Sequence, residues 1–304
     1  MDLRQLNALL AVAEHHSFSA AARALHTVQS NVSTHVARLE REVGATLIDR
    51  SRGELTVEGE IVADRARRIL AELRAIEDDL VSLRDEVTGT LRAGVIGTTA
   101  RWLVPRLLDT LERTHPRISL VVVEATTTSL VPQLLGDRLD VAVVNLPVDD
   151  PDIDTEVLFE EDRVVITPIG HPLADHDVIG LDELGNHELL LPPTGTAFRD
   201  ELDMEARAAR VALQPKAEVD GLRLLTSLAF QGFAPAVVPA SAAPTWLEGE
   251  WKRVTIDGLS PRLVGLAQNR RRTPSAPTRA TIEVIRQVVA EGHSQMAITP
   301  RVGE

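Results

Sequence analysis

The feature that most limits how this chain can fold is a heptad repeat of apolar residues between positions 66 and 87. The apolar side chains recur at alternating spacings of three and four, the pattern by which one helix packs along another in a coiled coil. The predicted helix runs from about Glu58 to Glu86, roughly 40 Å at ~1.5 Å per residue. It could be an ordinary amphipathic helix on its own domain, but no helix adjacent in sequence could cover so long a stripe. We therefore predict a dimerising linker helix, whose seam consists of Ala66, Ile69, Leu73, Ile76, Leu80, Leu83 and Val87.

Three short helical patterns and a hairpin lie upstream of this linker. Apolar residues on one helix face predict the three helices, and a break at His26-Thr27 separates the second from the third. Gly44 ends the third helix, since glycine readily adopts the left-handed conformation that closes many helices. The third helix is followed by two strand-like segments, which are joined by a turn with a basic tip. This order is typical of a winged helix-turn-helix. The predicted helices span about residues 3–13, 18–25 and 29–43, and the hairpin spans residues 47–57.

From residue 88 onward, strand-like and helix-like segments alternate. This alternation predicts a parallel-type sheet with helices on both faces. A last strand at residues 263–268 and a last helix at residues 278–291 close the pattern, and residues 293–304 are expected to form a loose tail. The chain is therefore predicted to be an α+β multidomain protein, in which a winged helix-turn-helix, a long linker helix and an α/β region follow one another.

The composition excludes several classes of function. The 304 residues include no cysteine, so the chain forms no disulfide, no thiolate metal site and no thiol redox sensor. The formal net charge of −13 argues against a protein that coats nucleic acid nonspecifically. Residues 1–56 balance six arginines against six acidic residues, so any DNA binding must rest on a few well-placed arginines and on base contacts. Neither a signal peptide nor a membrane-spanning run is visible, and we expect a cytoplasmic protein.

Several stretches resemble the LysR-type transcriptional regulators, over essentially residues 1–291. The matching pieces are SFSAAARALHTVQSNVSTHVARLEREVGATLIDR, LTVEGE and GTLRAGVIGTTARWLVPRLLDTLERTHPRISLVVVEA, with looser matches at LDVAVVN, HPLA and FQGFAPAVVP. The resemblance implies a two-lobed, periplasmic-binding-protein-like (type II) effector domain. It also implies a homodimer or homotetramer that binds double-stranded DNA, with RNA polymerase as a further partner. The implied domains are a DNA-binding domain (1–58), a linker helix (59–88), an effector domain (89–293, with lobe I at 89–162 and 265–293 and lobe II at 163–264) and a tail (294–304).

The chain departs from the pattern of this family at three places. Val28 stands where the family commonly has serine, so we expect Thr27 to cap the third helix instead. Ser-Asn at residues 30–31 replaces a frequent Pro-Ala and adds two hydrogen-bonding side chains to the leading edge of that helix. Gly-Phe-Ala at residues 232–234 replaces the usual Gly-x-Gly at the rim of the pocket.

The third helix carries the candidate DNA-reading residues. In a helix-turn-helix, the second helix of the pair enters the major groove and its first residues meet base edges. Gln29 can bond N6 and N7 of an adenine, and Arg38, further along, suits a phosphate or a guanine. The alternative is that these polar residues only cap and solvate a helix start. Arg50 and Arg52 on the hairpin are expected to contact phosphates or the minor groove, with solvated surface arginines as the alternative. The candidate DNA-binding residues are Gln29, Ser30, Asn31, Ser33, Thr34, Arg38, Arg50 and Arg52.

Hydroxyl and amide side chains follow the strands of the two-lobed region, where this architecture binds ligands. Thr98 and Thr99 precede a helix, which makes either an anion site or a simple N-cap. Arg101 or Arg223 could pair with a carboxylate of the effector, although Asp220 could cancel that charge. We therefore expect a small-molecule effector, a carboxylate or another anion. The candidate effector-binding residues are Thr98, Thr99, Thr126, Thr127, Asn145, Pro168, Thr194 and Thr196.

These patterns together predict a sequence-specific DNA-binding transcription regulator whose activity is modulated by an effector bound between two lobes. Three alternatives remain open. The first is a solute-binding protein of similar fold, which would not need the predicted DNA-binding domain and linker of residues 1–88. The second is an enzyme, which would need a nucleophile and a base, and no such set is visible in the sequence. A constitutive architectural DNA binder would carry the lobes without using them. The histidines form no metal-ligand pattern, so we expect no metal and no cofactor.

Overall fold

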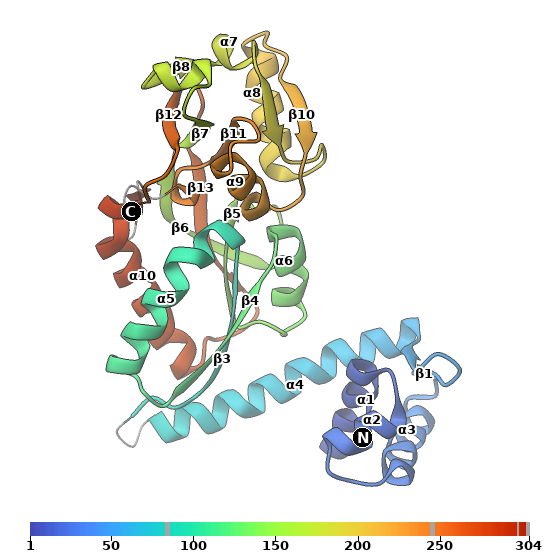
Figure 1. The fold of residues 1–304 in the computed structure, drawn as a ribbon. Coiled ribbons are helices and arrows are strands. Elements are labelled where there is room, and N and C mark those ends of the chain that lie inside the picture. Colours follow the sequence, from blue (N-terminus) through green and yellow to red (C-terminus); the bar gives the residue numbers. More distant parts are fainter. Residues whose placement is uncertain (83–85, 244–246, 297, 302–304) are drawn as a thin grey trace.

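A computed structural model of the chain describes residues 1–82, 86–243, 247–296 and 298–301. An N-terminal domain, a long helix and two stacked lobes follow one another through the molecule (Figure 1). This arrangement confirms the predicted fold class. The first elements are α1 (Leu3–His15), α2 (Phe18–Ala24), α3 (Gln29–Val43), β1 (Ile48–Asp49), β2 (Glu54–Leu55) and α4 (Val57–Ser82).

Local sequence explains where the first three helices begin and end. The carboxylate of Asp2 accepts a hydrogen bond from the backbone N–H of Gln5, whose own side chain bonds back to the cap, so a capping box starts α1. Ser17 caps α2 through its hydroxyl. Gly44 ends α3 with a φ of 72°, a left-handed conformation that a glycine adopts without strain.

One apolar core holds the three helices, the hairpin and the first half of α4 together. Leu9, Val36 and Leu39 are fully buried in it, and Ala63 and Ala66 of α4 pack into the same core. Ala66, predicted as the first position of the seam, is therefore a core residue of the DNA-binding domain. Because α4 shares this core, the direction in which it leaves the domain is fixed by packing.

The second half of α4 carries two different faces. Ala71 and Ala75 are buried, whereas the four residues of the predicted seam in this half are between 37% and 59% exposed. This exposed seam, a bare apolar stripe along the helix, consists of Ile69, Leu73, Ile76 and Leu80. A stripe of this kind on an otherwise packed helix marks a surface that another helix can cover.

The described part of the linker helix runs to Ser82, and Leu83 falls outside the described residues. Glu86 and Val87 are not helical, so Val87 lies beyond the helix and not in the seam. The chain turns back against α4 at Gly89, whose φ is 137° and where an added Cβ would lie 2.7 Å from Asp78. The helix must stop before this return.

Charged contacts fix the end of α4 against the lobe that follows it. The carboxylate of Asp79 accepts from the backbone N–H of Ala276 at 2.8 Å, which caps the last helix of that lobe. Arg68 Nε lies 3.1 Å from the carboxylate of Asp137, which is buried. Burial raises the pKa of Asp137, while Arg272 and Arg68 oppose that rise.

Lobe I contains a six-stranded mixed sheet with the strand order β14-β6-β13-β5-β3-β4. Strand β3 is parallel to β4 and β5, whereas β13 is antiparallel to β5 and β6. Helices α5 and α10 pack against each other beside this sheet (Figure 1). The elements are β3 (Gly89–Val95), α5 (Gly97–Thr114), β4 (Ile118–Glu124), α6 (Thr127–Leu135), β5 (Val141–Leu146), β6 (Ile153–Glu161), β13 (Arg262–Asn269), α10 (Ala276–Met296) and β14 (Ile298–Pro300).

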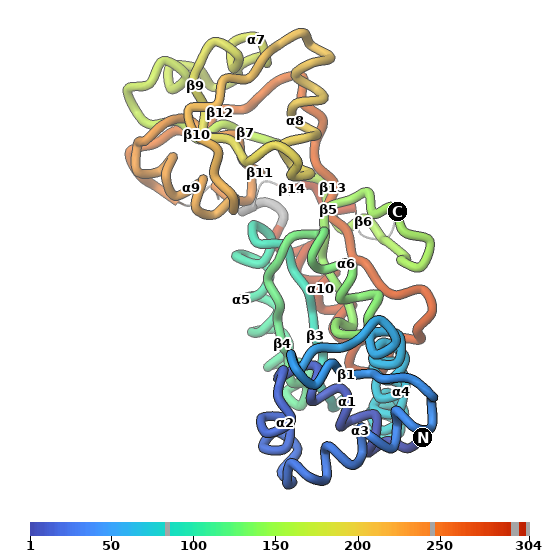
Figure 2. The backbone as a smooth tube through the Cα atoms, turned by 90° about the vertical axis from the view of Figure 1, so that its right-hand side faces the viewer, coloured from blue at the N-terminus to red at the C-terminus, as the bar shows by residue number. Residues whose placement is uncertain are grey.

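Lobe II contains a second six-stranded mixed sheet, with the order β10-β9-β11-β7-β12-β8, and an apolar core on each face. Along the described residues, the chain crosses between the lobes from β6 to β7 and again from β12 to β13 (Figure 2). The elements are β7 (Arg163–Pro168), η1 (Pro172–Asp175), β8 (Val178–Gly180), α7 (Leu181–Leu184), β9 (Glu188–Leu191), α8 (Ala197–Ala208), β10 (Gln214–Glu218), α9 (Leu222–Phe230), β11 (Ala236–Pro239), η2 (Ala240–Ala242) and β12 (Trp251–Asp257).

The structure corrects three sequence predictions in this region. Neither sheet is wholly parallel, because the strand that follows each crossing runs against its neighbours. This strand is β7 in lobe II and β13 in lobe I. Lobe II ends before residue 262 and not at 264, since β13 pairs with lobe I strands from its first residue. Residues 298–300 are not a loose tail: they form β14, which covers the open edge of β6. Across the described ranges, no helix is long and apolar enough to cross a membrane.

Candidate DNA-binding surface and effector site

The predicted DNA-reading residues share the exposed side of α3. Val32, Val36 and Leu39 on the opposite side are fully buried. The polar residues are exposed apart from Ser33, which is half-buried; they are Gln29, Ser30, Asn31, Ser33, Thr34 and Arg38. The short side chains leave the first turns of α3 accessible to a flat partner, as a groove floor requires.

The start of α3 differs from the prediction for Thr27. The cap position is Val28, which offers no side-chain hydrogen bond, because the helix begins one residue later than a Thr27 cap would need. The hydroxyl of Thr27 instead accepts from Nδ2 of Asn31 at 3.1 Å. The free N–H groups of the first turn are therefore left without a side-chain cap, and they suit a phosphate oxygen.

The hairpin tip carries two arginines with different surroundings. Arg50 lies 3.3 Å from Glu40 and its guanidinium is 5.6 Å from the ring centroid of Phe18. Arg52 is exposed at the tip itself. Gly53 places that tip against the first helices, since an added Cβ would lie 2.1 Å from the carbonyl oxygen of His16. Arg52 is therefore held beside the helix-turn-helix, with a charge that Glu40 does not neutralise.

A buried ion pair stands where the chain crosses between the lobes. Arg262 is 5% exposed and Glu161 is 2% exposed, and Arg262 Nε donates to Glu161 Oε1 at 2.6 Å. The other carboxylate oxygen accepts from the backbone N–H of Ser241 in lobe II at 3.0 Å. This hinge pair thus ties both lobes at their junction.

Three of the predicted effector residues converge on the hinge pair from lobe I. Arg262 donates to Thr98 Oγ1 at 2.8 Å and to Asn145 Oδ1 at 3.1 Å. The backbone N–H of Asn145 in turn donates to Thr127 Oγ1 at 3.0 Å. Strand ends β3, β5 and the start of α6 therefore meet at one point, as predicted for this architecture.

Thr98 and Thr99 are not N-caps of α5. The cap residue is Ile96, so the first N–H groups of α5 receive no side-chain hydrogen bond. Thr99 is fully buried, and its hydroxyl has no hydrogen-bond partner among the described residues. The same holds for the hydroxyls of Thr167 and Ser241, which lie in lobe II. Buried hydroxyls without partners are rare in folded proteins.

The remaining predicted residues are not joined to this network by a hydrogen bond in the described ranges. The hydroxyl of Thr126 bonds only to side chains at the start of α6, those of Thr128 and Ser129. Thr196 donates to the carbonyl of Pro193 at 2.8 Å and so closes its own loop in lobe II. Thr194 is exposed in that loop, and Pro168 ends β7.

The two arginines considered as carboxylate partners make contacts between the lobes. Arg223 of α9 lies 2.9 Å from Glu124 of β4, and not against Asp220. Arg101 of α5 donates to the carbonyl of Ala242 at 3.4 Å. Arg223 and Glu124 are both partly exposed, so this contact can open without leaving a buried charge unpaired.

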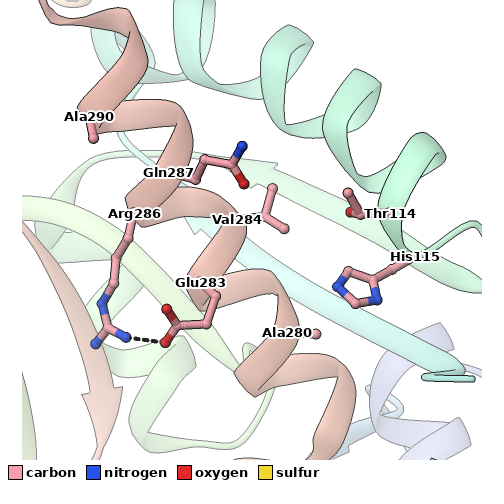
Figure 3. Close-up of a pocket in the computed structure, with 8 residues that line it drawn as sticks. All are labelled: Thr114, His115, Ala280, Glu283, Val284, Arg286, Gln287 and Ala290. Atoms are coloured by element: carbon pink, nitrogen blue, oxygen red, sulfur yellow. Dashed lines mark hydrogen bonds and ion pairs between the residues drawn. The ribbon is translucent and has the colours of Figure 1, made fainter.

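A surface groove of about 600 Å³ lies elsewhere in lobe I, between α10 and the end of α5 (Figure 3). Arg286 points away from the α5 side of the groove and pairs with Glu283 and Glu156. The groove is thus not lined by the residues predicted for the effector. Its lining consists of Thr114, His115, Ala280, Glu283, Val284, Arg286, Gln287 and Ala290.

Sequence reasoning missed the central pair of the site. Glu161 and Arg262 are 101 residues apart, and each stands at the end of a strand in a run of charged or polar residues that resembles a loop.

Comparisons with known proteins agree with this geometry. The model for bacterial regulatory helix-turn-helix proteins of the lysR family matches residues 3–60, and the LysR substrate binding domain matches residues 84–290. A probable hydrogen peroxide-inducible genes activator of Streptomyces viridosporus is 35% identical over 244 residues, which are 79% of this chain and 78% of that protein.

Solved structures extend the similarity over the whole chain. A cysteine-to-aspartate variant of full-length OxyR from Pseudomonas aeruginosa has a TM-score of 0.77 at 26% identity, over 95% of this chain and 94% of that one. Full-length CbnR complexed with its target DNA has a TM-score of 0.70 at 25% identity, over 95% of this chain and 100% of that one. With a DNA-binding domain, a linker helix and an effector domain in this order, the chain belongs to the LysR family of DNA-binding transcription regulators.

Proposed function

We propose that the first turns of α3 read base edges of an operator and that the hairpin contacts its phosphates. The observation that carries this proposal is the division of α3 into a fully buried apolar side and an exposed polar side. A helix seated in this way presents its N-terminal turns to the major groove. The polar side is also nearly free of acidic residues, so phosphates can approach it.

Two variants separate base reading from backbone contact. Gln29→Ala should cost roughly 1–3 kcal/mol of binding free energy on the preferred duplex and relax the preference at one base, since a bidentate contact is lost. Arg52→Ala should weaken binding to preferred and scrambled duplexes alike and reduce the salt slope by about one unit. Both variants are titrated on both duplexes at several salt concentrations. Equal losses on the two duplexes for Gln29→Ala would exclude base reading by that residue.

We infer that the signal is a bound small molecule and not the oxidation of a thiol. Several relatives are named hydrogen peroxide-inducible activators, and the OxyR structure is a cysteine variant. This chain contains no cysteine in its 304 residues, so thiol oxidation has no substrate here. The DNA-binding architecture can be shared while the chemistry of the signal differs.

The effector site proposed here lies at the hinge pair, between the start of α5 and lobe II. The uncapped first turn of α5 and the unpartnered hydroxyl of Thr99 both supply donors. Donors at a helix start favour a carboxylate or another small anion. Arg262 is already bonded to three acceptors, so it organises the site and is not the free cation for that anion.

Thr99→Val tests this site most cleanly, because it deletes a hydroxyl without breaking a bond of the free protein. We expect binding of the effector to weaken by about 0.5–1.5 kcal/mol. Thr281→Val is the matched control, since Thr281 is also fully buried and its hydroxyl also has no partner in the described chain. A calorimetric screen of small carboxylic acids supplies the ligand. If both variants bind it as the wild type does, or if no carboxylate binds, the site or the ligand class is wrong.

The effector would act by changing how the lobes sit on each other and therefore how α4 holds the paired DNA-binding domains. It can move this equilibrium only by its difference in affinity for the two states. We propose a homodimer or homotetramer as the functional assembly, with RNA polymerase as a further partner on DNA. The effector is bound and released unchanged.

A further inference from the structure

A single side-chain hydrogen bond joins the start of α2 to the start of α3. The hydroxyl of Ser19 donates to Oε1 of Gln29 at 2.8 Å, and both side chains are exposed. Buried Ala21 and Ala22 anchor α2, and buried Val32 anchors α3, so the bond connects two fixed elements. A bond at an exposed position adds little to the stability of the fold, because water can replace it. Its main effect falls on the orientation of the Gln29 amide.

The amide of Gln29 can face a base in two ways. With Nε2 outward it donates to acceptors such as N7 of a purine, and with Oε1 outward it accepts from donors such as N4 of cytosine. Because the hydroxyl of Ser19 occupies one lone pair of Oε1, Nε2 is turned outward. The second lone pair of Oε1 remains available, so a bidentate contact with N6 and N7 of adenine is still allowed.

We infer that Ser19 is a positioning residue for base recognition, which holds the Gln29 amide with its N–H groups outward. This orientation selects a base with a major-groove acceptor, a purine or thymine, over cytosine at the base that Gln29 meets. This inference rests on the proposed role of Gln29, and it extends base selection to a residue outside the recognition helix. The side-chain amide of Asn31, on the same helix, has the opposite orientation. Asn31 donates through Nδ2 to Thr27, which leaves its own oxygen outward.

Ser19→Ala tests the inference because it removes the hydroxyl and leaves Gln29 in place. The full chain is titrated on a duplex that the wild type selects from a random pool, and on duplexes with each other base at the position where Gln29→Ala loses its preference. The preference for the selected base over cytosine should fall by about 2–10-fold. The melting temperature and the affinity for a scrambled duplex should stay unchanged, and Ser19→Thr, which keeps the hydroxyl, should restore the preference.

A double-mutant cycle distinguishes positioning from direct contact. In a Gln29→Ala background, Ser19→Ala should change nothing further, because a positioning residue acts through the side chain that it positions. An additive loss that includes the scrambled duplex would mean that Ser19 touches phosphate itself, which overturns the inference.

Two other outcomes separate the inference from the proposed function. If Gln29→Ala loses base preference and Ser19→Ala keeps it, the inference fails and the role of Gln29 stands. If neither variant changes base preference, the role of Gln29 fails and the inference fails with it.

Discussion

Replacing Glu161 with alanine should lower the free energy of unfolding of the effector domain by about 3–5 kcal/mol. The change leaves the guanidinium of Arg262 buried without its counter-ion and leaves the backbone N–H of Ser241 without an acceptor. An uncompensated buried charge is among the most costly changes that a single substitution can make. Urea unfolding followed by tryptophan fluorescence measures this loss, since Trp102 and Trp251 lie in lobe I and lobe II.

Asp154→Ala is the matched control, because Asp154 lies on the same strand and pairs with Arg270 at the surface. Both side chains of that pair are more than half exposed, so its removal should cost less than about 1 kcal/mol. Glu161→Leu combined with Arg262→Met should recover much of the loss, since no charge is then left unpaired. Equal effects of Glu161→Ala and Asp154→Ala would show that the hinge pair does not hold the lobes.

Replacing Ile76 with lysine should break the assembly while leaving each chain folded. Ile76 is 55% exposed in the single chain, so the substitution disturbs no core of its own domain. In a dimer paired along the exposed seam, the lysine would be buried at a cost of several kcal/mol. Light scattering should report a smaller mass, and operator affinity should fall steeply because two half-sites are no longer bound together.

Glu77→Lys provides the control for this change, since Glu77 is exposed beside the seam and the substitution alters the charge even more. That variant should keep the mass of the wild type. If Ile76→Lys also keeps it, the chains associate through another surface and the seam has a different partner.

The sequence was most informative where a pattern is local and repeated. The heptad stripe predicted a linker helix with an exposed seam, and the buried and exposed sides of α3 follow from apolar spacing alone. Boundaries were less predictable because they depend on contacts distant in sequence. Ala66 packs in the core of the DNA-binding domain and not in the seam. The chain turns back against α4 at Gly89, so Val87 lies outside the helix.

The residues that meet at the hinge pair were predicted only in part, for a physical reason. Strand ends could be assigned from local apolar runs, so Thr98, Thr127 and Asn145 were placed together correctly. The pair of Glu161 and Arg262 could not be predicted, because neither segment contains a sequence pattern that indicates an ion-pair partner 101 residues away. The short strand β14 was missed because three residues are too few to show an alternating pattern.

With a net charge of −13, the chain should bind DNA through a few base contacts and not through its overall charge. The most direct measurement is a titration of the full chain on an operator duplex, selected from a random pool, and on its scrambled counterpart at several salt concentrations. We predict that the operator is bound at least about 10³-fold more tightly at physiological salt, with a shallow salt slope that reflects few phosphate contacts. Equal affinities for the two duplexes, falling together as salt rises, would show that charge and not base contact governs binding.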